Sequence, residues 1–291
     1  EGRLEMLNFI NALKALDTNI KTTFKATKDK VEDPLKNVLY DVTKVNGSVA
    51  NILIMNTAPG MKEFKSERRP GLVDGTSQHI TPRKWEATLD VKREQSEDDD
   101  LGRVPAAVRK MAANAQKHYQ VLVTVGLMKG FTVNLDDGKP FFDASRGNLQ
   151  TGELNKTNLE AARTKLQKQV DGNNEPLGYI ATTLVVGPSN QSKAEELLNA
   201  QQINGTSNTL YKTLKLVVNP RITDTSWYVL DDTEGIYPLT IAERVASSAP
   251  VSKTDLNSDK AFDRDVFSWG IRGRYDVAYV DPTLIVGSTG A

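Results

Sequence analysis

The segment VKREQSEDDDLG, residues 91–102, concentrates side chains that could support metal chemistry. Its carboxylates fall close together, at Glu94, Glu97, Asp98, Asp99 and Asp100. A site for a hard divalent cation needs oxygen ligands that converge from several segments or an EF-hand loop, and the glycine-containing EF-hand pattern is missing. A helical pattern begins directly after the cluster, which favours carboxylates that complement the positive end of that helix. A divalent-metal-dependent enzyme that uses residues 94–100 stays open as an alternative.

Other patterns that indicate catalysis are weak. The sequence has no cysteine, which excludes thiolate zinc sites and cysteine nucleophiles, and its two histidines are His79 and His118. Neither a G-x-S-x-G elbow nor a glycine-rich phosphate loop occurs. The acidic pairs at 136–137 and 231–232 adjoin glycines and are typical of turns. We therefore expect no catalytic residue, no cofactor and no bound metal.

Residues 61–93 are rich in lysine and arginine, which could contact nucleic acid phosphates. Aromatic residues on which bases could stack are nearly absent, with only Phe64 and Trp85 nearby. The whole chain carries 37 basic and 37 acidic residues, so the footprint of a dedicated nucleic-acid binder is missing. Separated charge on a neutral chain suits binding to copies of itself. A nucleic-acid-binding accessory protein that uses this basic loop remains the second alternative.

The basic loop and the acidic cluster together define the residues that we expect at contacts between subunits. They are Lys62, Lys65, Arg68, Arg69, Arg83, Lys84, Trp85, Glu94, Glu97, Asp98, Asp99 and Asp100.

Two helices and a long hairpin must position these residues. Apolar residues recur every third position over residues 4–16, and at three- and four-residue spacing over 101–129, which predicts two helices. The second has Pro105 in its first turn and Gly130 at its end, and it would be about 40 Å long. The alternation in KWEATLDVKR predicts a strand, which we assign to a hairpin with a polar tip near residues 71–79. An isolated hairpin is marginally stable in water, so it needs a partner surface.

The rest of the chain predicts an α+β fold. Residues 158–170 have a helical pattern, and strands and helices alternate from 158 to 262, with a loop-like stretch near its end. A long strand returns to a sheet after residue 266. The 291 residues, 38% of them hydrophobic, suffice for one large or two ordinary domains, and we see no membrane span and no signal peptide.

The phrases WEATLDVKREQSEDDDLG, GKPFFDASRGN, NPRITDTSWYVLDD and FSWGIRGRYDVAYVDP, in this order, resemble the major head subunits of Mu-like phages. The layout resembles the HK97-like capsid fold of tailed phages, and the likeness covers roughly residues 85–282. The resemblance implies an N-terminal arm at 1–56 and an extended β-hairpin, the E-loop, at 57–97. It also implies a P-domain at 98–157 with the spine helix 101–130, an A-domain at 158–262 and a returning P-domain strand at 263–291.

The function that the resemblance implies is structural. Such a protein assembles with itself into hexamers and pentamers of an icosahedral head that encloses double-stranded DNA, which it contacts non-specifically. Portal, scaffold or decoration proteins are the further partners, with no membrane. The location is the virion, after assembly in the cytoplasm of the bacterial host. The start at Glu1 is compatible with the removal of an N-terminal segment by a protease.

Overall fold

The computed structural model describes residues 2–57, 74–97, 102–171, 174–203, 205–256 and 258–291. By its contacts the chain forms two compact units. The first comprises Glu1–Asp33, Pro82–Tyr119 and Glu243–Tyr275, and the second comprises Pro34–Thr81, Gln120–Ala242 and Asp276–Ala291. These units reflect packing within one chain, so the predicted arm, E-loop, P-domain and A-domain boundaries stay a prediction. No helix in the described ranges is long and apolar enough to cross a membrane.

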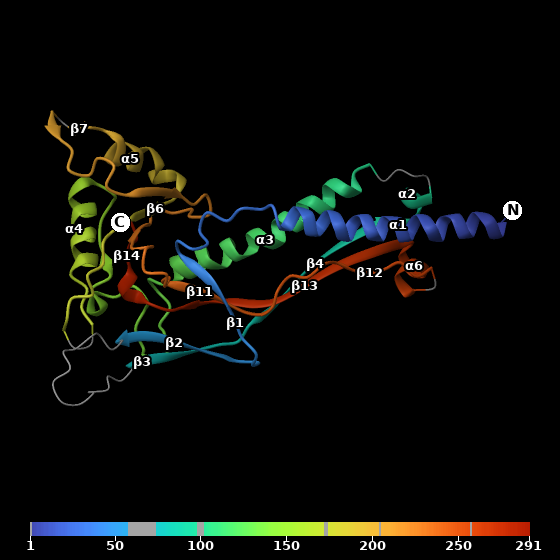
Figure 1. Cartoon of the computed structure of the whole chain (residues 1–291), viewed down its shortest axis with the longest axis horizontal. Helices are drawn as coiled ribbons and strands as arrows, with labels where there is room; N and C mark the ends of the chain where they lie inside the picture. Colours follow the sequence, from blue (N-terminus) through green and yellow to red (C-terminus); the bar gives the residue numbers. More distant parts are fainter. Residues whose placement is uncertain (1, 58–73, 98–101, 172–173, 204, 257) are drawn as a thin grey trace, which may run out of the picture. The chain divides into compact units, whose positions relative to one another are not determined.

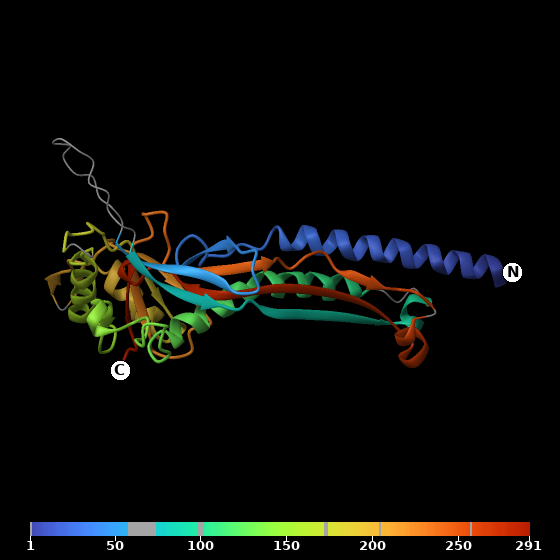
Figure 2. The ribbon, with the colours of Figure 1, turned by 90° about the horizontal axis from the view of Figure 1, so that it is seen from below.

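The first unit is built on an antiparallel ladder between two long strands (Figure 1). Its elements are α1 (Gly2–Lys28), β4 (Arg83–Lys92), α2 (Arg93–Glu97), the first part of α3 (Val104–Lys129), the end of β11 (Leu239–Val245), β12 (Val251–Lys253), α6 (Asp259–Arg264) and most of β13 (Val266–Tyr279). The ladder runs from Val266 opposite Lys92 to Tyr275 opposite Arg83. β12 also pairs with β13, with Val251 opposite Gly270. Figure 2 shows β4 and β13 running alongside one another.

The core of this unit forms where two helices cover the ladder. Its buried apolar side chains come from α1, α3, β4, α6 and β13, and they are Leu13, Leu16, Ile20, Phe24, Val91, Val104, Val108, Ala112, Ala261, Phe267, Trp269 and Ile271. The four from α1 recur at three- and four-residue spacing, which places them on one face of a helix. The predicted helix at 4–16 is confirmed but continues to Lys28, because Ile20 and Phe24 extend the buried face through a polar stretch.

The long helix that periodicity predicts over residues 101–129 is confirmed as α3. Gly130 ends it, with its backbone N–H donating to the carbonyls of Gly126 and Leu127. The first turn of α3 contains no acidic residue. The predicted pairing of the acidic cluster with this helix end is therefore wrong for Glu94, which lies in the first turn of α2. α2 is a separate short helix before α3. A hydrogen bond from the backbone N–H of its first residue, Arg93, to the carbonyl of Asp265 at 3.0 Å holds it in place.

The second unit contains a five-stranded sheet with the order β5-β14-β10-β6-β9. Its strands are β5 (Leu149–Gln150), β6 (Thr183–Val186), β9 (Lys215–Val218), β10 (Trp227–Leu230) and β14 (Ile285–Ser288). α4 (Lys156–Gln167) contacts β10 and β14, and α5 (Pro188–Asn199) contacts β6 and β9. Every residue of β6 and β10 is buried, as their apolar runs predict for central strands. Parallel and antiparallel pairs occur together, which confirms the α+β class.

Smaller elements complete the second unit. They are β1 (Tyr40–Lys44), β2 (Ala50–Thr57), β3 (Asp74–Ile80), β7 (Gln202–Ile203), β8 (Thr206–Ser207) and two 3₁₀ turns, η1 (Ala144–Arg146) and η2 (Pro282–Leu284). β1 lies beside β11 in the sheet order β1-β11-β13-β12, in which β4 pairs with β13. The elements α3, β11 and β13 have residues in both units.

The hairpin differs from the one that the sequence predicts. β2 and β3 form a two-stranded sheet of their own, with Ala50 opposite Ile80, and residues 74–79 belong to β3 rather than to a tip. The strand KWEATLDVKR is confirmed, but its assignment to the hairpin is wrong, because it pairs with β13. The apolar face of β4 packs on the core of the first unit through Ala87 and Leu89, and this burial decides its partner. Residues 58–73 lie outside the described ranges.

Replacing Trp269 by alanine is expected to lower the free energy of unfolding of the unassembled chain by about 3–5 kcal/mol. The indole is fully buried and its Nε1 donates to Asp17 Oδ1 at 3.0 Å, so the change leaves a cavity and removes one of the donors to the Asp17 carboxylate. Denaturant titration followed by circular dichroism measures the effect. Trp269→Phe, which keeps most of the apolar contact, is the control and should cost less than half as much. Equal losses in the two variants would contradict this account of the core.

Candidate interaction surface

An apolar groove of about 390 Å³ opens in the first unit along β4, β13 and α3. The hydrophobic part of its lining consists of Trp85, Ala87, Leu89, Ala107, Met111, Ala115 and Ile271. The strand residues alternate, so they share one face of β4, and Met111 and Ala115 are one turn apart on α3. These side chains are only half-buried, apart from Ile271. The groove is therefore an apolar surface that the chain's own packing leaves partly uncovered.

Trp85 lies at one end of this groove and is anchored by its own chain. Its indole Nε1 donates to the carbonyl of Tyr275 at 2.9 Å. The ring of His118 meets the indole edge-on, with 4.4 Å between centroids, and the guanidinium of Arg83 lies over the indole at 4.8 Å. Because these contacts fix the ring, Trp85 presents a pre-ordered aromatic surface.

A buried polar network supports this aromatic end. The Tyr275 hydroxyl lies 3.1 Å from Nδ1 of His118, and the Tyr275 ring meets the Tyr119 ring at right angles, with 4.6 Å between centroids. The Tyr119 hydroxyl donates to the carboxylate of Glu243, whose residue is only 9% exposed. Burial raises the pKa of Tyr119, and the hydrogen bond to Glu243 raises it further. The phenol therefore stays protonated and satisfies a carboxylate that would otherwise be buried without a donor.

The described residues of the expected contact set lie at both ends of β4. Arg83 and Lys84 are exposed at its start beside Trp85, and Glu94 is exposed in α2 just after its end. A strand of this length separates its ends by about 30 Å, so these basic and acidic side chains do not meet within one chain. Lys62, Lys65, Arg68, Arg69, Asp98, Asp99 and Asp100 lie outside the described residues, and Glu97 is placed only as the last residue of α2.

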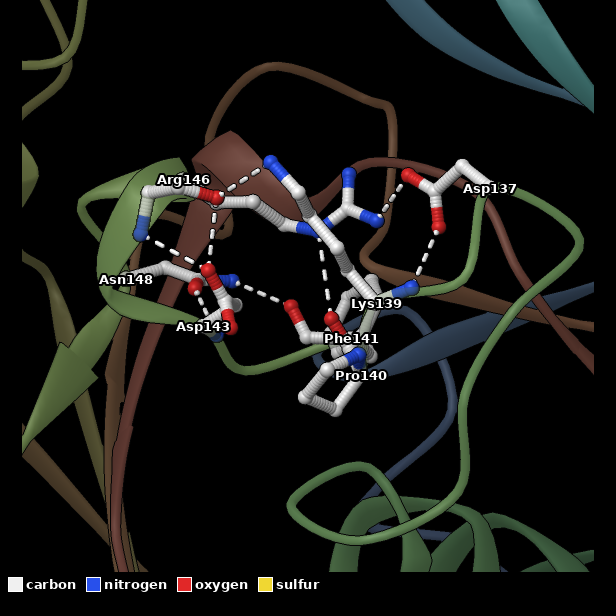
Figure 3. A network of polar contacts seen from close by, with 8 residues as sticks. Asp137, Lys139, Pro140, Phe141, Asp143, Arg146 and Asn148 are labelled. Atoms are coloured by element: carbon white, nitrogen blue, oxygen red, sulfur yellow. Dashed lines mark hydrogen bonds and ion pairs between the residues drawn. The ribbon is translucent and has the colours of Figure 1, made fainter.

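The acidic pair at 136–137, which the sequence assigns to a turn, makes separate structural contacts in the second unit. Asp136 accepts from the backbone N–H of His79 at 3.2 Å and lies 3.0 Å from Nδ1 of the same ring. Asp137 pairs with Arg146 and accepts from the backbone N–H of Lys139, as Figure 3 shows. The carboxylates therefore hold different partners and do not converge on a shared site.

The other polar residues of GKPFFDASRGN stabilise the same turn. Asp143 caps η1 by accepting from the backbone N–H of Ser145 at 2.8 Å. The hydrogen bond from the Ser145 hydroxyl, and then this backbone bond, lower the pKa of Asp143. The side chain of Asn148 accepts from the backbone N–H of Asp143 and donates to the carbonyl of Phe141 (Figure 3). This network orders the segment that leads from α3 to β5.

The second acidic pair also has structural partners. Asp231 accepts from the backbone N–H groups of Ile180 and Thr233, and Asp232 accepts from the hydroxyls of Thr182 and Thr183. Across the described ranges, no group of three or more histidine, aspartate or glutamate side chains could hold a metal ion. These carboxylates connect loops to strand ends.

The base of the β2–β3 hairpin is attached to the second unit by a buried amide. Gln78 is 8% exposed, and its Oε1 accepts from the backbone N–H of Tyr279 at 2.9 Å. On β2, Ile54 is buried, whereas Leu53 is 39% exposed and lines a second groove of about 250 Å³ with Ile236 and others. Sequence reasoning missed Leu53, Gln78 and the Tyr119–Glu243 pair. The apolar run VANILIM was a signal for the first, but no local pattern indicates the other two.

Comparison with known structures identifies the class of fold. The chain is similar to the procapsid protein of bacteriophage JBD30, with a TM-score of 0.62 at 21% identity over 95% of this chain and 74% of that chain. It is also similar to a virus-like particle protein from Pyrococcus furiosus, with a TM-score of 0.55 at 10% identity over 92% and 97% of the two chains. The HK97-like fold that the resemblance implied is confirmed.

The sequence comparisons then give the family. Residues 75–287 match the family model described as phage capsid protein. Over 266 residues the chain is 22% identical to the Mu-like prophage FluMu major head subunit of Haemophilus influenzae, which covers 89% of this chain and 70% of that protein. The chain therefore belongs to the phage capsid protein family, in which it is a major capsid protein of a phage head. Neither alternative, the metal-dependent enzyme or the accessory nucleic-acid binder, gains support.

Tyr119→Phe is expected to lower the free energy of unfolding by about 1.5–3 kcal/mol, because it removes the donor to a buried carboxylate. Tyr275→Phe, which removes the contacts of a hydroxyl with the neutral partners His118 and Ser247, should cost about 0.5–1.5 kcal/mol. Urea titration of the unassembled variants compares the two. The interpretation of the Glu243 contact fails if Tyr119→Phe is the milder change.

His79→Ala is expected to raise the pKa of Asp136 toward its ordinary value. The hydrogen bonds from the His79 side chain and backbone hold this pKa down, and the substitution removes the side-chain contact. Since the pKa of Asp136 is lower in the folded state than in the unfolded state, the contact adds to the free energy of unfolding at pH values above the unfolded-state pKa. This contribution is lost as the pH falls through the folded-state pKa. Carboxyl NMR titration measures the change, and Lys139→Ala, in the same loop, is the control with no expected effect. An unaltered Asp136 titration in His79→Ala would rule out this assignment.

Proposed function

We propose that this chain assembles with itself into hexamers and pentamers of an icosahedral head that encloses double-stranded DNA. Membership of the phage capsid protein family carries the proposal. Structural similarity adds support, because the chain resembles a subunit from the mature capsid of bacteriophage PhiM1, with a TM-score of 0.54 at 15% identity over 89% of each chain. The head is then assembled in the cytoplasm of the bacterial host and becomes part of the virion.

The β2–β3 hairpin supports a role in contacts between copies. It is a separate two-stranded sheet, and such a sheet gains little stability in water without another layer on its apolar face. The side chain of Ile54 is buried, so one face of the strand is covered within the chain. Leu53 lies on the opposite face of the strand and is left partly exposed beside a groove. We assign the covering of this residue to a neighbouring subunit.

The ends of β4 support contacts of opposite charge. Arg83 and Lys84 are separated from Glu94 by the length of β4, so they can form ion pairs only with other partners. Complementary charges on neighbouring copies would set the register of assembly more than its affinity. The remaining members of the expected contact set, from Lys62 to Arg69 and from Glu97 to Asp100, belong to the same proposal.

Several finer points also belong to this proposal. Residues 1–56 act as the arm, 57–97 as the E-loop, 98–157 with 263–291 as the P-domain, and 158–262 as the A-domain. The packaged DNA is contacted without sequence specificity, in keeping with the balanced charge of the chain. Portal, scaffold or decoration proteins are the further partners.

Electron microscopy and light scattering of the purified chain test the proposal directly. Closed particles tens of nanometres wide, with six- and five-fold rings, are the expected result. A chain that stays monomeric over a wide range of concentration and salt, while folded by circular dichroism, would contradict self-assembly.

Leu53→Asp is expected to reduce the yield of particles about tenfold or more, because it places a charge where an apolar side chain meets a neighbour. The fold should persist, since Leu53 is already partly exposed. Val133→Asp, at a residue of the second unit that is 48% exposed and does not line this groove, is the control, because it adds the same charge in place of an exposed apolar side chain. Sedimentation of assembly reactions measures the yield. Equal yields for both variants would refute the role of Leu53.

A further inference from the structure

The short helix α6 displays a phenylalanine to solvent. Phe262 is 88% exposed, more than any other large hydrophobic side chain in the described part of the chain. The next most exposed, Val251 at 72%, lies on β12 in the same unit. Isolated surface hydrophobics are common, but an aromatic ring that is almost wholly exposed offers much unused apolar area. Neither the groove along β4 nor the β2–β3 hairpin includes these residues.

The backbone that carries Phe262 is held firmly. Ser258 caps α6 by accepting from the N–H of Ala261, and Ala261 is buried in the core of the first unit. At the other end, Asp265 adopts the left-handed conformation and its carbonyl accepts from the backbone N–H of Arg93. The ring is therefore presented on an anchored turn, so little backbone entropy is lost when it is covered.

Lys260 fixes the orientation of this helix on the ladder. Its Nζ donates to Ser268 Oγ at 3.0 Å and lies 3.6 Å from Asp90 Oδ1. Ser268 is also opposite Lys253, so β12 and α6 approach the same position of β13. The exposed hydrophobics Val251 and Phe262 therefore belong to elements that are attached at one point.

Phe262 is followed by two residues of opposite charge, which could pair with the same two residues of a second copy. Asp263 and Arg264 are both exposed, and the described residues give neither of them an ion pair. Opposite charges on adjacent positions allow the aspartate of one copy to meet the arginine of another across a rotation axis. In such a contact the same surface serves both partners, and the apolar ring lies near the axis. A partner of uniform charge would repel one of the two residues.

We propose that α6 forms a symmetric contact with α6 of a second copy of this chain, in which Phe262 packs on its counterpart and Asp263 and Arg264 exchange ion pairs. This contact rests on the proposed self-assembly and names a surface for it. Each pair of rings removes apolar area from water on both partners, and the charges select the relative orientation.

Charge exchange gives the sharpest test. Asp263→Arg and Arg264→Asp are each expected to lower the particle yield about tenfold, because each creates like charges across the contact. The double variant restores the opposite pair in reversed order, so it should recover most of the wild-type yield. Recovery supports a self-complementary contact. Failure of the double variant to exceed the single variants would overturn it.

Phe262→Asp tests the apolar part and is expected to lower the yield at least as much as a single charge reversal. Ile180→Asp, at a residue that is 62% exposed in the second unit, is the matched control and should assemble normally. Circular dichroism of the unassembled variants verifies their folding. If Phe262→Asp is misfolded, Phe262→Leu takes its place in the test, and it should assemble because it keeps apolar area.

The outcomes separate this inference from the proposed function. If wild type forms particles and Phe262→Asp forms them equally well, the α6 contact is refuted and self-assembly stands. If wild type forms no particles, self-assembly itself fails. If Phe262→Asp assembles normally by itself but shows defects when other head proteins are added, Phe262 contacts a different partner, and the α6 contact is also refuted.

Discussion

The first unit depends on the register of a single ladder, that between β4 and β13. One face of β13 directs Phe267, Trp269 and Ile271 into the core that α1 and α3 cover. A slip of one residue would turn all three to the other face of the sheet, so burial specifies the register strongly. The hydrogen bond from the Trp269 indole to Asp17 on α1 also depends on this register, because the indole of a slipped strand could not reach Asp17.

The same register requires a glycine near the aromatic cluster. Gly273 lies opposite Trp85, and a Cβ atom built there would come within 2.5 Å of the Tyr275 ring. The absence of a side chain therefore lets the Tyr275 ring fold back along its own strand, where it can meet both His118 and Tyr119. The backbone of β13 at Gly273 therefore both keeps the strand in register and leaves room for the aromatic side chains that contact Trp85.

Sequence patterns predicted the elements better than their partners. The spine helix and the face of Trp85, Ala87 and Leu89 followed from periodicity, because burial on one side imposes it. Alternation cannot tell which strand lies alongside, so β4 was wrongly assigned to the hairpin. The loop-like stretch before β13 contains β12 and α6, whose short lengths carry little periodic signal. The Tyr119–Glu243 bond joins residues 124 positions apart, which no local pattern encodes.

Gln78 determines which motions remain open to the β2–β3 hairpin. Its amide oxygen is the acceptor for the Tyr279 backbone N–H inside the second unit. Neighbouring residues on a strand face opposite ways, so neither Ser77 nor His79 could replace it after a one-residue displacement. Sliding along the strand axis would leave a buried donor unsatisfied, whereas pivoting about this attachment would not. The angle of the paired strands β2 and β3 can therefore change without loss of the hydrogen bond between Gln78 and Tyr279.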